Sequence, residues 1–213
     1  MRTHPAVLVA CVLAATACAP ILPPPLPTTS LHEVVHESPS PGGIWSPFDP
    51  IAESDVAALR LSGLLVPVRG VPLAKIEDSF DAPRDGGRRH DAVDILAPRG
   101  TAVLAAADGV VLRVGTNTLG GNVVWMSDTD GRFVFYYAHL ERYARGVRSG
   151  ARITRGTPIG YVGTTGNAPA NVPHLHFQLM RMTDTAKWWN GTPVNPVPFL
   201  VEPAAPAAPG KSQ

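Results

Sequence analysis

Residues 120–139 read GGNVVWMSDTDGRFVFYYAH, which is two apolar runs separated by a short polar turn. The runs Val123–Ser127 and Phe133–His139 are rich in β-branched and aromatic residues, and Asp130-Gly131 lies between them. An Asp-Gly pair in this position is a strong β-hairpin signal, because both residues tolerate the positive φ angles of a tight turn. This stretch therefore predicts two antiparallel strands.

The segments on either side continue the same pattern. Thr101–Ala107 and Val110–Val114 flank Asp108-Gly109, which predicts a second hairpin, and Pro158–Val162 and His174–Arg181 are two further strand candidates. No long segment with a helical period of 3.6 residues follows residue 64. We therefore expect a mostly β, antiparallel domain with little helix.

Composition restricts the function classes. The 213 residues include 18 basic and 17 acidic side chains, for a formal net charge of +1, and no basic patch argues for nucleic acid as a partner. The two cysteines are Cys11 and Cys18, so the rest of the chain has no disulfide, no Cys-ligated zinc and no Cys nucleophile. A metal would have to be held by His and carboxylate side chains.

Residues 1–17 have the features of an export signal, with Arg2 followed by a short apolar run. The small residues before Cys18 resemble a lipobox, so we expect Cys18 to carry a lipid. Two alternatives remain open: Cys11 as the lipid acceptor, and ordinary signal cleavage after Ala17. The expected location is the cell envelope, as a periplasmic lipoprotein anchored in the outer membrane or, alternatively, as a secreted periplasmic protein.

Four further segments follow the leader. Residues 18–48 are Pro-rich and predict an extended, disordered tether. Residues 49–63 predict a short helical lead-in, in which Asp49-Pro50 starts a helix that runs to about Arg60. The domain body is expected at 64–200, and residues 201–213 form a tail of Pro, Ala and Gly that predicts disorder.

The tether contains a histidine motif that matches a known metal-binding signature. His32-Glu-Val-Val-His36 spells H-E-x-x-H, the signature of helical zinc proteases. That chemistry needs both imidazoles on one face of a stable helix, whereas Pro27 and Pro39 bracket a window too short for one. We expect this motif to have no catalytic role.

The four histidines of the body form a more coherent set. His174 and His176 are two apart in a strand-like run, so both imidazoles face one side while Leu175 packs on the other. His90 and Asp94 are four apart, which in an extended segment also places them on one side. His139 ends the predicted strand Phe133–His139. Each feature alone is weak, and a lone strand-end histidine is more often a satisfied polar residue. Together they suggest a zinc site with an open position.

The motifs match a known family in identity, order and spacing. His90-x3-Asp94, then Tyr137-Ala-His139-Leu, then His174-Leu-His176 resemble the three motifs of the M23 (LytM/lysostaphin-type) zinc metallopeptidases. The resemblance covers roughly residues 80–200. It implies a small antiparallel β fold with an open groove, one Zn²⁺ ion and hydrolysis of peptide bonds in peptidoglycan stems or crosslinks. It also implies that His90, Asp94 and His176 bind the zinc, and that His139 and His174 deprotonate the attacking water and steady the oxyanion.

The sequence departs from the family pattern at two places. Ala92 stands where the family often has Gly, and the segment before His90 has no Tyr that could serve as an extra oxyanion donor, only Arg84, Arg88 and Arg89. The resemblance implies peptidoglycan as a partner, and the lipid expected on Cys18 implies a membrane. A regulatory envelope protein is a further expected partner. The alternative function is a non-catalytic activator of cell-wall amidases, because some relatives have lost zinc ligands. A secreted scaffold related to carrier-type β domains is a weaker reading, since no lysine-bearing carrier hairpin is present.

Overall fold

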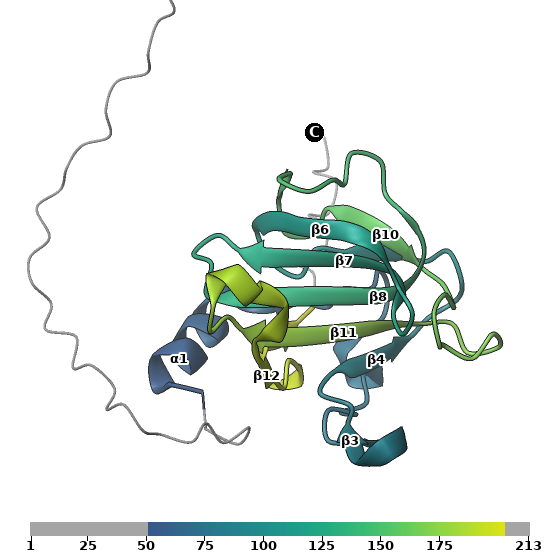
Figure 1. Ribbon diagram of the computed structural model, residues 1–213, viewed down its shortest axis with the longest axis horizontal. Coiled ribbons are helices and arrows are strands. Elements are labelled where there is room, and N and C mark those ends of the chain that lie inside the picture. The colour runs from purple at the N-terminus through teal and green to yellow at the C-terminus, as the bar shows by residue number, and fades with distance from the viewer. Residues whose placement is uncertain (1–50, 203–213) are drawn as a thin grey trace, which may run out of the picture. The chain divides into compact units, whose positions relative to one another are not determined.

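The computed structural model describes residues 51–202, and strands dominate this part of the chain (Figure 1). One α-helix, α1 (Glu53–Ser62), precedes them. The strands are β1 (Leu64–Leu65), β2 (Pro83–Arg84), β3 (Arg88–Arg89), β4 (Val93–Leu96), β5 (Ala102–Leu104), β6 (Gly109–Asn117), β7 (Gly121–Asp128), β8 (Phe133–Tyr143), β9 (Arg152–Ile153), β10 (Pro158–Val162), β11 (His174–Arg181), β12 (Thr192–Val194) and β13 (Leu200–Val201). Short 3₁₀ turns are η1 (Leu73–Lys75), η2 (Asp85–Gly87), η3 (Thr185–Asn190) and η4 (Val197–Phe199). The predicted fold class, mostly β and antiparallel with little helix, is confirmed.

A nine-stranded antiparallel sheet forms the centre, and its main strand order is β12-β11-β8-β7-β6-β9. Figure 1 shows β6, β7, β8 and β11 running side by side. One edge of β11 pairs with β8, while its other edge pairs first with β4 and then with β12. Strand β10 pairs with both β5 and β8. Because β4 lies next to the start of β11, the motif His90-x3-Asp94 comes to lie beside the motif His174-Leu-His176.

The hairpin predicted around Asp130-Gly131 is present as β7 and β8. Trp125 lies opposite Tyr136, and Ser127 opposite Val134. Gly131 has a φ of 69°, and the Asp128 carboxylate accepts hydrogen bonds from the backbone N–H groups of the turn. The strands predicted at 158–162 and 174–181 also have these bounds in β10 and β11.

The hairpin predicted around Asp108-Gly109 is wrong. β5 pairs with β10, and β6 pairs with β7 and β9, so the two predicted arms are not partners. Ala105 exchanges backbone hydrogen bonds with Thr157 and Gly156, and the Asp108 carboxylate accepts a hydrogen bond from the Arg155 N–H. Pairing partners distant in sequence therefore hold both sides of a turn that looked local.

The two faces of the central sheet have different neighbours. Leu175, Phe177 and Leu179 of β11 are fully buried in the main hydrophobic core, together with Phe135 and Tyr137 of β8. The alternate residues of the same strands turn to the other face, where a smaller apolar cluster includes Tyr136 and Met180. The expectation that Leu175 packs on the face opposite the two histidines of β11 is confirmed, and Phe177 packs on that face with it.

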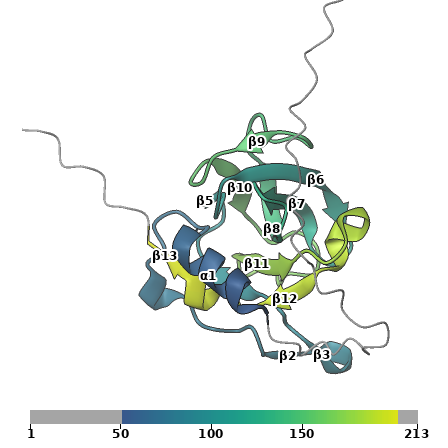
Figure 2. The same cartoon turned by 90° about the vertical axis from the view of Figure 1, so that its left-hand side faces the viewer.

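The helical lead-in is shorter than predicted at its start. Its N-cap is Ala52, so α1 does not begin beside Asp49. Leu59 enters the main core, and the Arg181 side chain donates to the buried Asp55 carboxylate. Figure 2 shows α1 beside β13, where Val201 pairs with Leu65, so the expected tail does not begin at residue 201.

Several predictions fall on residues that the structure does not describe. These are the export signal, the tether, the tail after residue 202, and the residues Cys11, Cys18, His32, His36 and Asp49. In the described range 51–202, no helix is both long and apolar enough to cross a membrane.

Candidate metal centre

Strands β4 and β11 bring the first and third motifs together. In their antiparallel ladder Asp94 lies directly opposite His176, so the two side chains share one face of the sheet. His90 lies before β4, and Asp91, with a φ of 55°, turns the chain between them. The prediction that His90 and Asp94 converge is confirmed, but its reason was wrong, because the segment is bent by a left-handed residue rather than extended.

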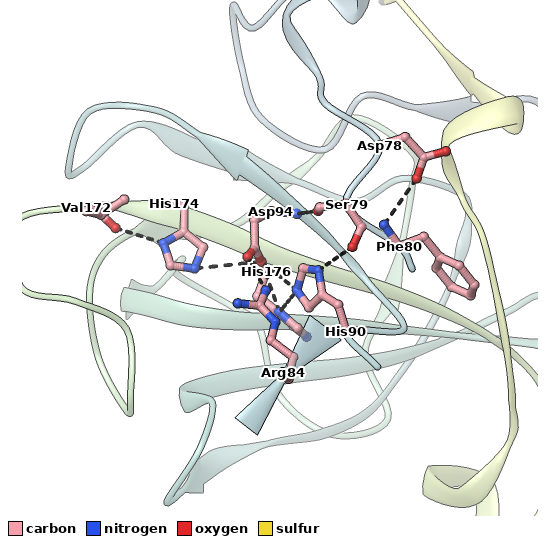
Figure 3. A network of polar contacts seen from close by, with 9 residues as sticks. All are labelled: Asp78, Ser79, Phe80, Arg84, His90, Asp94, Val172, His174 and His176. Carbon is pink, nitrogen blue, oxygen red and sulfur yellow. Dashed lines mark hydrogen bonds and ion pairs between the residues drawn. The ribbon is translucent and has the colours of Figure 1, made fainter. Parts of the chain in front are cut away.

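The three side chains form a compact triangle (Figure 3). His90 Nε2 lies 3.0 Å from Asp94 Oδ1 and 3.0 Å from His176 Nδ1, and the latter two atoms are 3.1 Å apart. Among residues 51–202, this is the group of His and carboxylate side chains that could hold a metal ion. Tetrahedral zinc with bonds of about 2.0–2.1 Å separates its ligand atoms by about 3.3 Å, so two imidazoles and a carboxylate at these distances fit zinc.

A surrounding set of hydrogen bonds orients two of these ligands. His90 Nδ1 is 2.9 Å from the Ser79 carbonyl, which can only accept, so Nδ1 carries the proton and Nε2 is left as a metal ligand. The Ser79 hydroxyl accepts from the Asp94 N–H at 3.1 Å. Arg84 Nη2 donates to Asp94 Oδ2 at 2.6 Å, which occupies the carboxylate oxygen that is not in the triangle.

His139 reaches the site through a bulge in β8. The register between β7 and β8 shifts between Asn122 and Val124, and His139 has a φ of 60° at that point. A bulge re-aims a side chain, and here it brings the ring within 4.8 Å of His174, centre to centre. The prediction that a strand ends at His139 was wrong, because β8 continues to Tyr143.

Backbone packing fixes the bulge. His139 N–H donates to the Gly120 carbonyl, and its Nδ1 donates to the Thr165 carbonyl at 2.8 Å. Gly121 and Gly166 allow this, because a Cβ at either position would lie 2.3 Å from backbone atoms of the other loop. The ring orientation of His139 therefore depends on two glycine-containing loops.

His174 is held in the same manner. Its Nδ1 donates to the Val172 carbonyl at 2.8 Å, and its Nε2 lies 3.8 Å from Asp94 Oδ1. For both His139 and His174 the Nδ1 proton is therefore used by a carbonyl, and Nε2 remains for the cleft that both rings line. His174 shares a strand face with His176 but lies outside the three-residue triangle.

Burial and neighbouring charges set the protonation states. Burial opposes the charge of Asp94, but its close contacts with the His176 and His90 rings outweigh burial and hold the pKa of Asp94 well below its usual range. Burial lowers the pKa of His176 against the pull of Asp94, and burial lowers the pKa of His139 to about 4. At neutral pH the carboxylate is charged and these two imidazoles are neutral, which are the states that bind a metal or accept a proton.

The five side chains line a cleft of about 670 Å³. Tyr136 and Gln178 are on the side of β8 and β11, and Arg84 lies on the side of the β2–β3 hairpin. Leu119 and Val172, which are among the exposed large apolar residues of the described chain, line it as well. A cleft with both apolar and polar walls is suited to an extended peptide.

Two questions raised by the sequence are answered here. Among the non-glycine residues of 51–202, only Asp91 and His139 have positive φ, so Ala92 has an ordinary backbone angle and its methyl group is buried without strain. In the segment without Tyr, Arg84 contacts the site through Asp94. Sequence reasoning did not assign it a role, and it did not find the carbonyls of Ser79, Thr165 and Val172, because any residue type can supply a carbonyl.

A comparison with protein families assigns this region. The family described as Peptidase family M23 matches residues 88–196, which is just over half of the 213 residues and includes all five predicted site residues.

Known proteins share this region. The glycyl-glycine endopeptidase ALE-1 of Staphylococcus capitis is 40% identical over 115 residues, 54% of this chain and 30% of that protein. The L-Ala–D-Glu endopeptidase of Bacillus subtilis is 34% identical over 114 residues, 51% of this chain and 35% of that protein. A crystal structure of Helicobacter pylori Csd3 aligns with a TM-score of 0.51 at 29% identity, over 65% of this chain and 34% of that one. The matched region thus spans about a third of each relative's length.

Proposed function

Because the chain belongs to peptidase family M23, we propose that it hydrolyses peptide bonds in peptidoglycan stems or crosslinks with the aid of one zinc ion. The observation that carries this proposal is the complete triangle of His90, Asp94 and His176 at the base of a cleft that His139 and His174 also line. A non-catalytic relative would not need to keep all five side chains in this arrangement.

His90, Asp94 and His176 are the residues that would hold the ion. Three protein ligands leave a fourth position open, as catalytic zinc sites require. When bound there, zinc would polarise the scissile carbonyl and lower the pKa of a water molecule toward neutrality. Arg84 and Ser79 keep Asp94 in position, and the Ser79 carbonyl fixes the tautomer of His90.

His139 and His174 would act on the reacting atoms. Each ring donates its Nδ1 proton to a carbonyl, so its Nε2 can take a proton from the attacking water and later donate it to the leaving amine. Once protonated, the same atom can donate a hydrogen bond to the oxyanion of the tetrahedral intermediate. Burial lowers the pKa of His139, so this ring is in its neutral form, with a free lone pair on Nε2, at neutral pH.

The relatives support peptidoglycan as the substrate. Two of them carry names of endopeptidases for short peptide links, glycyl-glycine and L-Ala–D-Glu. The cleft also has the mixed apolar and polar lining that a peptide would contact.

We further propose that Cys18 carries a lipid and that residues 18–48 tether the domain to the envelope, with the outer membrane as the expected site. Membrane fractionation of Cys18→Ala tests this. The variant should move to the soluble fraction. A variant that stays membrane-bound would refute Cys18 as the anchor, and Cys11→Ala would then test the alternative acceptor.

The catalytic proposal is tested on purified peptidoglycan. The full chain should release fragments whose masses show new amino and carboxyl ends at a peptide bond, a chelator should stop this, and added zinc should restore it. His174→Ala serves as the inactive control. If no peptide bond is cut but a cell-wall amidase becomes more active when the chain is added, the activator function replaces the catalytic one.

A further inference from the structure

A row of aromatic rings extends from the metal centre along the same face of the sheet. We call Tyr136, Trp125, Trp188 and Trp189 the aromatic row. Tyr136 lines the cleft and lies edge-on to His176 with ring centres 6.0 Å apart, and it is the cross-strand neighbour of Trp125, with ring centres 4.1 Å apart. Tyr136 therefore connects the cleft to the aromatic row.

The outer half of the row lies on η3, between β11 and β12. Trp188 contacts Trp125 edge-on at 5.3 Å, and Trp189 contacts Trp188 at 5.3 Å and 89°. In Figure 1 this coil lies in front of the sheet, and the Trp125–Trp188 contact shows that it packs on that face. The Asp184 carboxylate accepts the Ala186 N–H at 2.8 Å, which holds the turn in place.

Packing explains part of the row but not its outer end. Trp125 and Trp188 are half-buried against the smaller apolar cluster that contains Met180, so they stabilise the fold. Trp189 is 53% exposed and is absent from both apolar clusters. Trp189 therefore presents a large aromatic ring at the end of a supported row, where another molecule can contact it.

We propose that the aromatic row, and Trp189 in particular, is a subsite for a sugar ring of the glycan strand to which the cleaved peptide is attached. This rests on the proposed function, since it takes peptidoglycan as the substrate. The axial C–H groups of a pyranose form an apolar, weakly positive face that stacks on the negative π face of an indole ring. A held, half-exposed indole is suited to this contact because little side-chain entropy is lost.

The distances agree with the connectivity of such a substrate. In peptidoglycan the peptide branches from the sugar chain, so a bond held at the metal centre lies a few residues from a sugar. An extended peptide of four to six residues spans about 13–21 Å. Successive ring centres from His176 to Trp189 are separated by 4.1–6.0 Å in four steps, so the two rings are at most about 21 Å apart, which is within reach of such a peptide.

The first experiment compares two substrates with the full zinc-loaded chain. One is a crosslinked peptide fragment that keeps its disaccharide, and the other is the same peptide after the sugar has been removed. We expect a higher kcat/KM for the sugar-bearing substrate than for the sugar-free one. Trp189→Ala should lower the ratio of these two kcat/KM values by about 3- to 10-fold. Leu61→Ala, which removes an exposed apolar side chain from α1, should leave the ratio unchanged.

The second experiment separates this inference from the proposed function. Peptide-free glycan strands are mixed with the zinc-free full chain, and the bound fraction is measured by co-sedimentation. The parent should bind more strongly than Trp189→Ala, and Trp189→Phe should recover part of the difference. Equal binding by parent and Trp189→Ala, or an equal loss of kcat/KM on both substrates, would overturn the sugar subsite. A chain that binds glycan but cuts neither substrate would refute the proposed catalysis and leave the subsite supported.

Discussion

The two faces of β11 meet different demands with alternating residues of one strand. Leu175, Phe177 and Leu179 are fully buried in the main core, whereas His174, His176 and Gln178 face the cleft. Packing of the core face fixes the position of the strand, and this position places the metal ligand His176 in the cleft. Damage to one face should therefore lower stability, while damage to the other should lower metal binding and rate.

The largest effects are expected on the cleft face, where His174 and His176 should behave differently. His176→Ala removes a corner of the triangle and should abolish zinc binding and peptidoglycan digestion. His174→Ala should keep its zinc and slow digestion by about 10²–10⁴-fold, the usual cost of a lost general acid–base group. Metal analysis and a digestion assay on both variants measure this.

The reverse pattern would exchange the two roles. If His174→Ala lost zinc and His176→Ala kept it, the ligand assignment would be wrong. If both variants kept zinc and digested normally, no catalytic role would remain for this strand.

The core face should respond in the opposite manner. Phe177→Ala leaves a cavity beside Phe135 and Tyr137 and should lower the free energy of unfolding by about 3–5 kcal/mol, measured by urea denaturation of the zinc-free chain. Gln178→Ala on the cleft face is the control and should change it by about 0.5 kcal/mol. Similar losses in both variants would show that the two faces are not energetically distinct.

A smaller effect is expected from Arg84, which contacts the metal centre only through Asp94. Arg84→Met should weaken zinc binding by roughly 10-fold, because Asp94 Oδ2, the carboxylate oxygen outside the triangle, loses the hydrogen bond that orients the carboxylate. Competition with a chromogenic chelator measures this without an activity assay. Arg99→Met breaks an exposed ion pair with Glu141 elsewhere and should leave zinc retention unchanged. A normal zinc affinity in Arg84→Met would limit this arginine to a surface contact.

The smallest effect concerns pH and His139. Its pKa is lowered to about 4 in the folded chain, so between about pH 4 and pH 6.5 the unfolded chain binds more protons than the folded one. The contribution of the neutral His139 ring to the free energy of unfolding is fully present above about pH 6.5 and declines as the pH falls toward 4. The zinc-free parent should lose more stability over this window than His139→Asn, whose side chain tolerates a φ of 60°. Equal slopes in urea titrations would contradict the buried, neutral state of His139.

Local sequence patterns were sufficient where neighbours in the chain are also neighbours in space. The β7–β8 hairpin follows from Asp130-Gly131 and its flanking apolar runs, and the bounds of β10 and β11 match their predicted ranges. Alternation along β11 was enough to place His174 and His176 on one face and Leu175 behind them. The three family motifs likewise named all five residues that the structure brings together around the cleft.

Tertiary structure decided the features that depend on partners distant in sequence. Asp108-Gly109 has the same local signal as Asp130-Gly131, yet β5 pairs with β10, because backbone groups pair with whichever strand packing places beside them. The left-handed turn at Asp91 and the bulge at His139 aim two site residues, and each is held by hydrogen bonds to backbone carbonyls of other segments, those of Phe80, Gly120 and Thr165. The contact of Arg84 with Asp94, and the row from Tyr136 to Trp189, arise from loops that meet only in the folded chain, so no pattern of neighbouring residues encodes them.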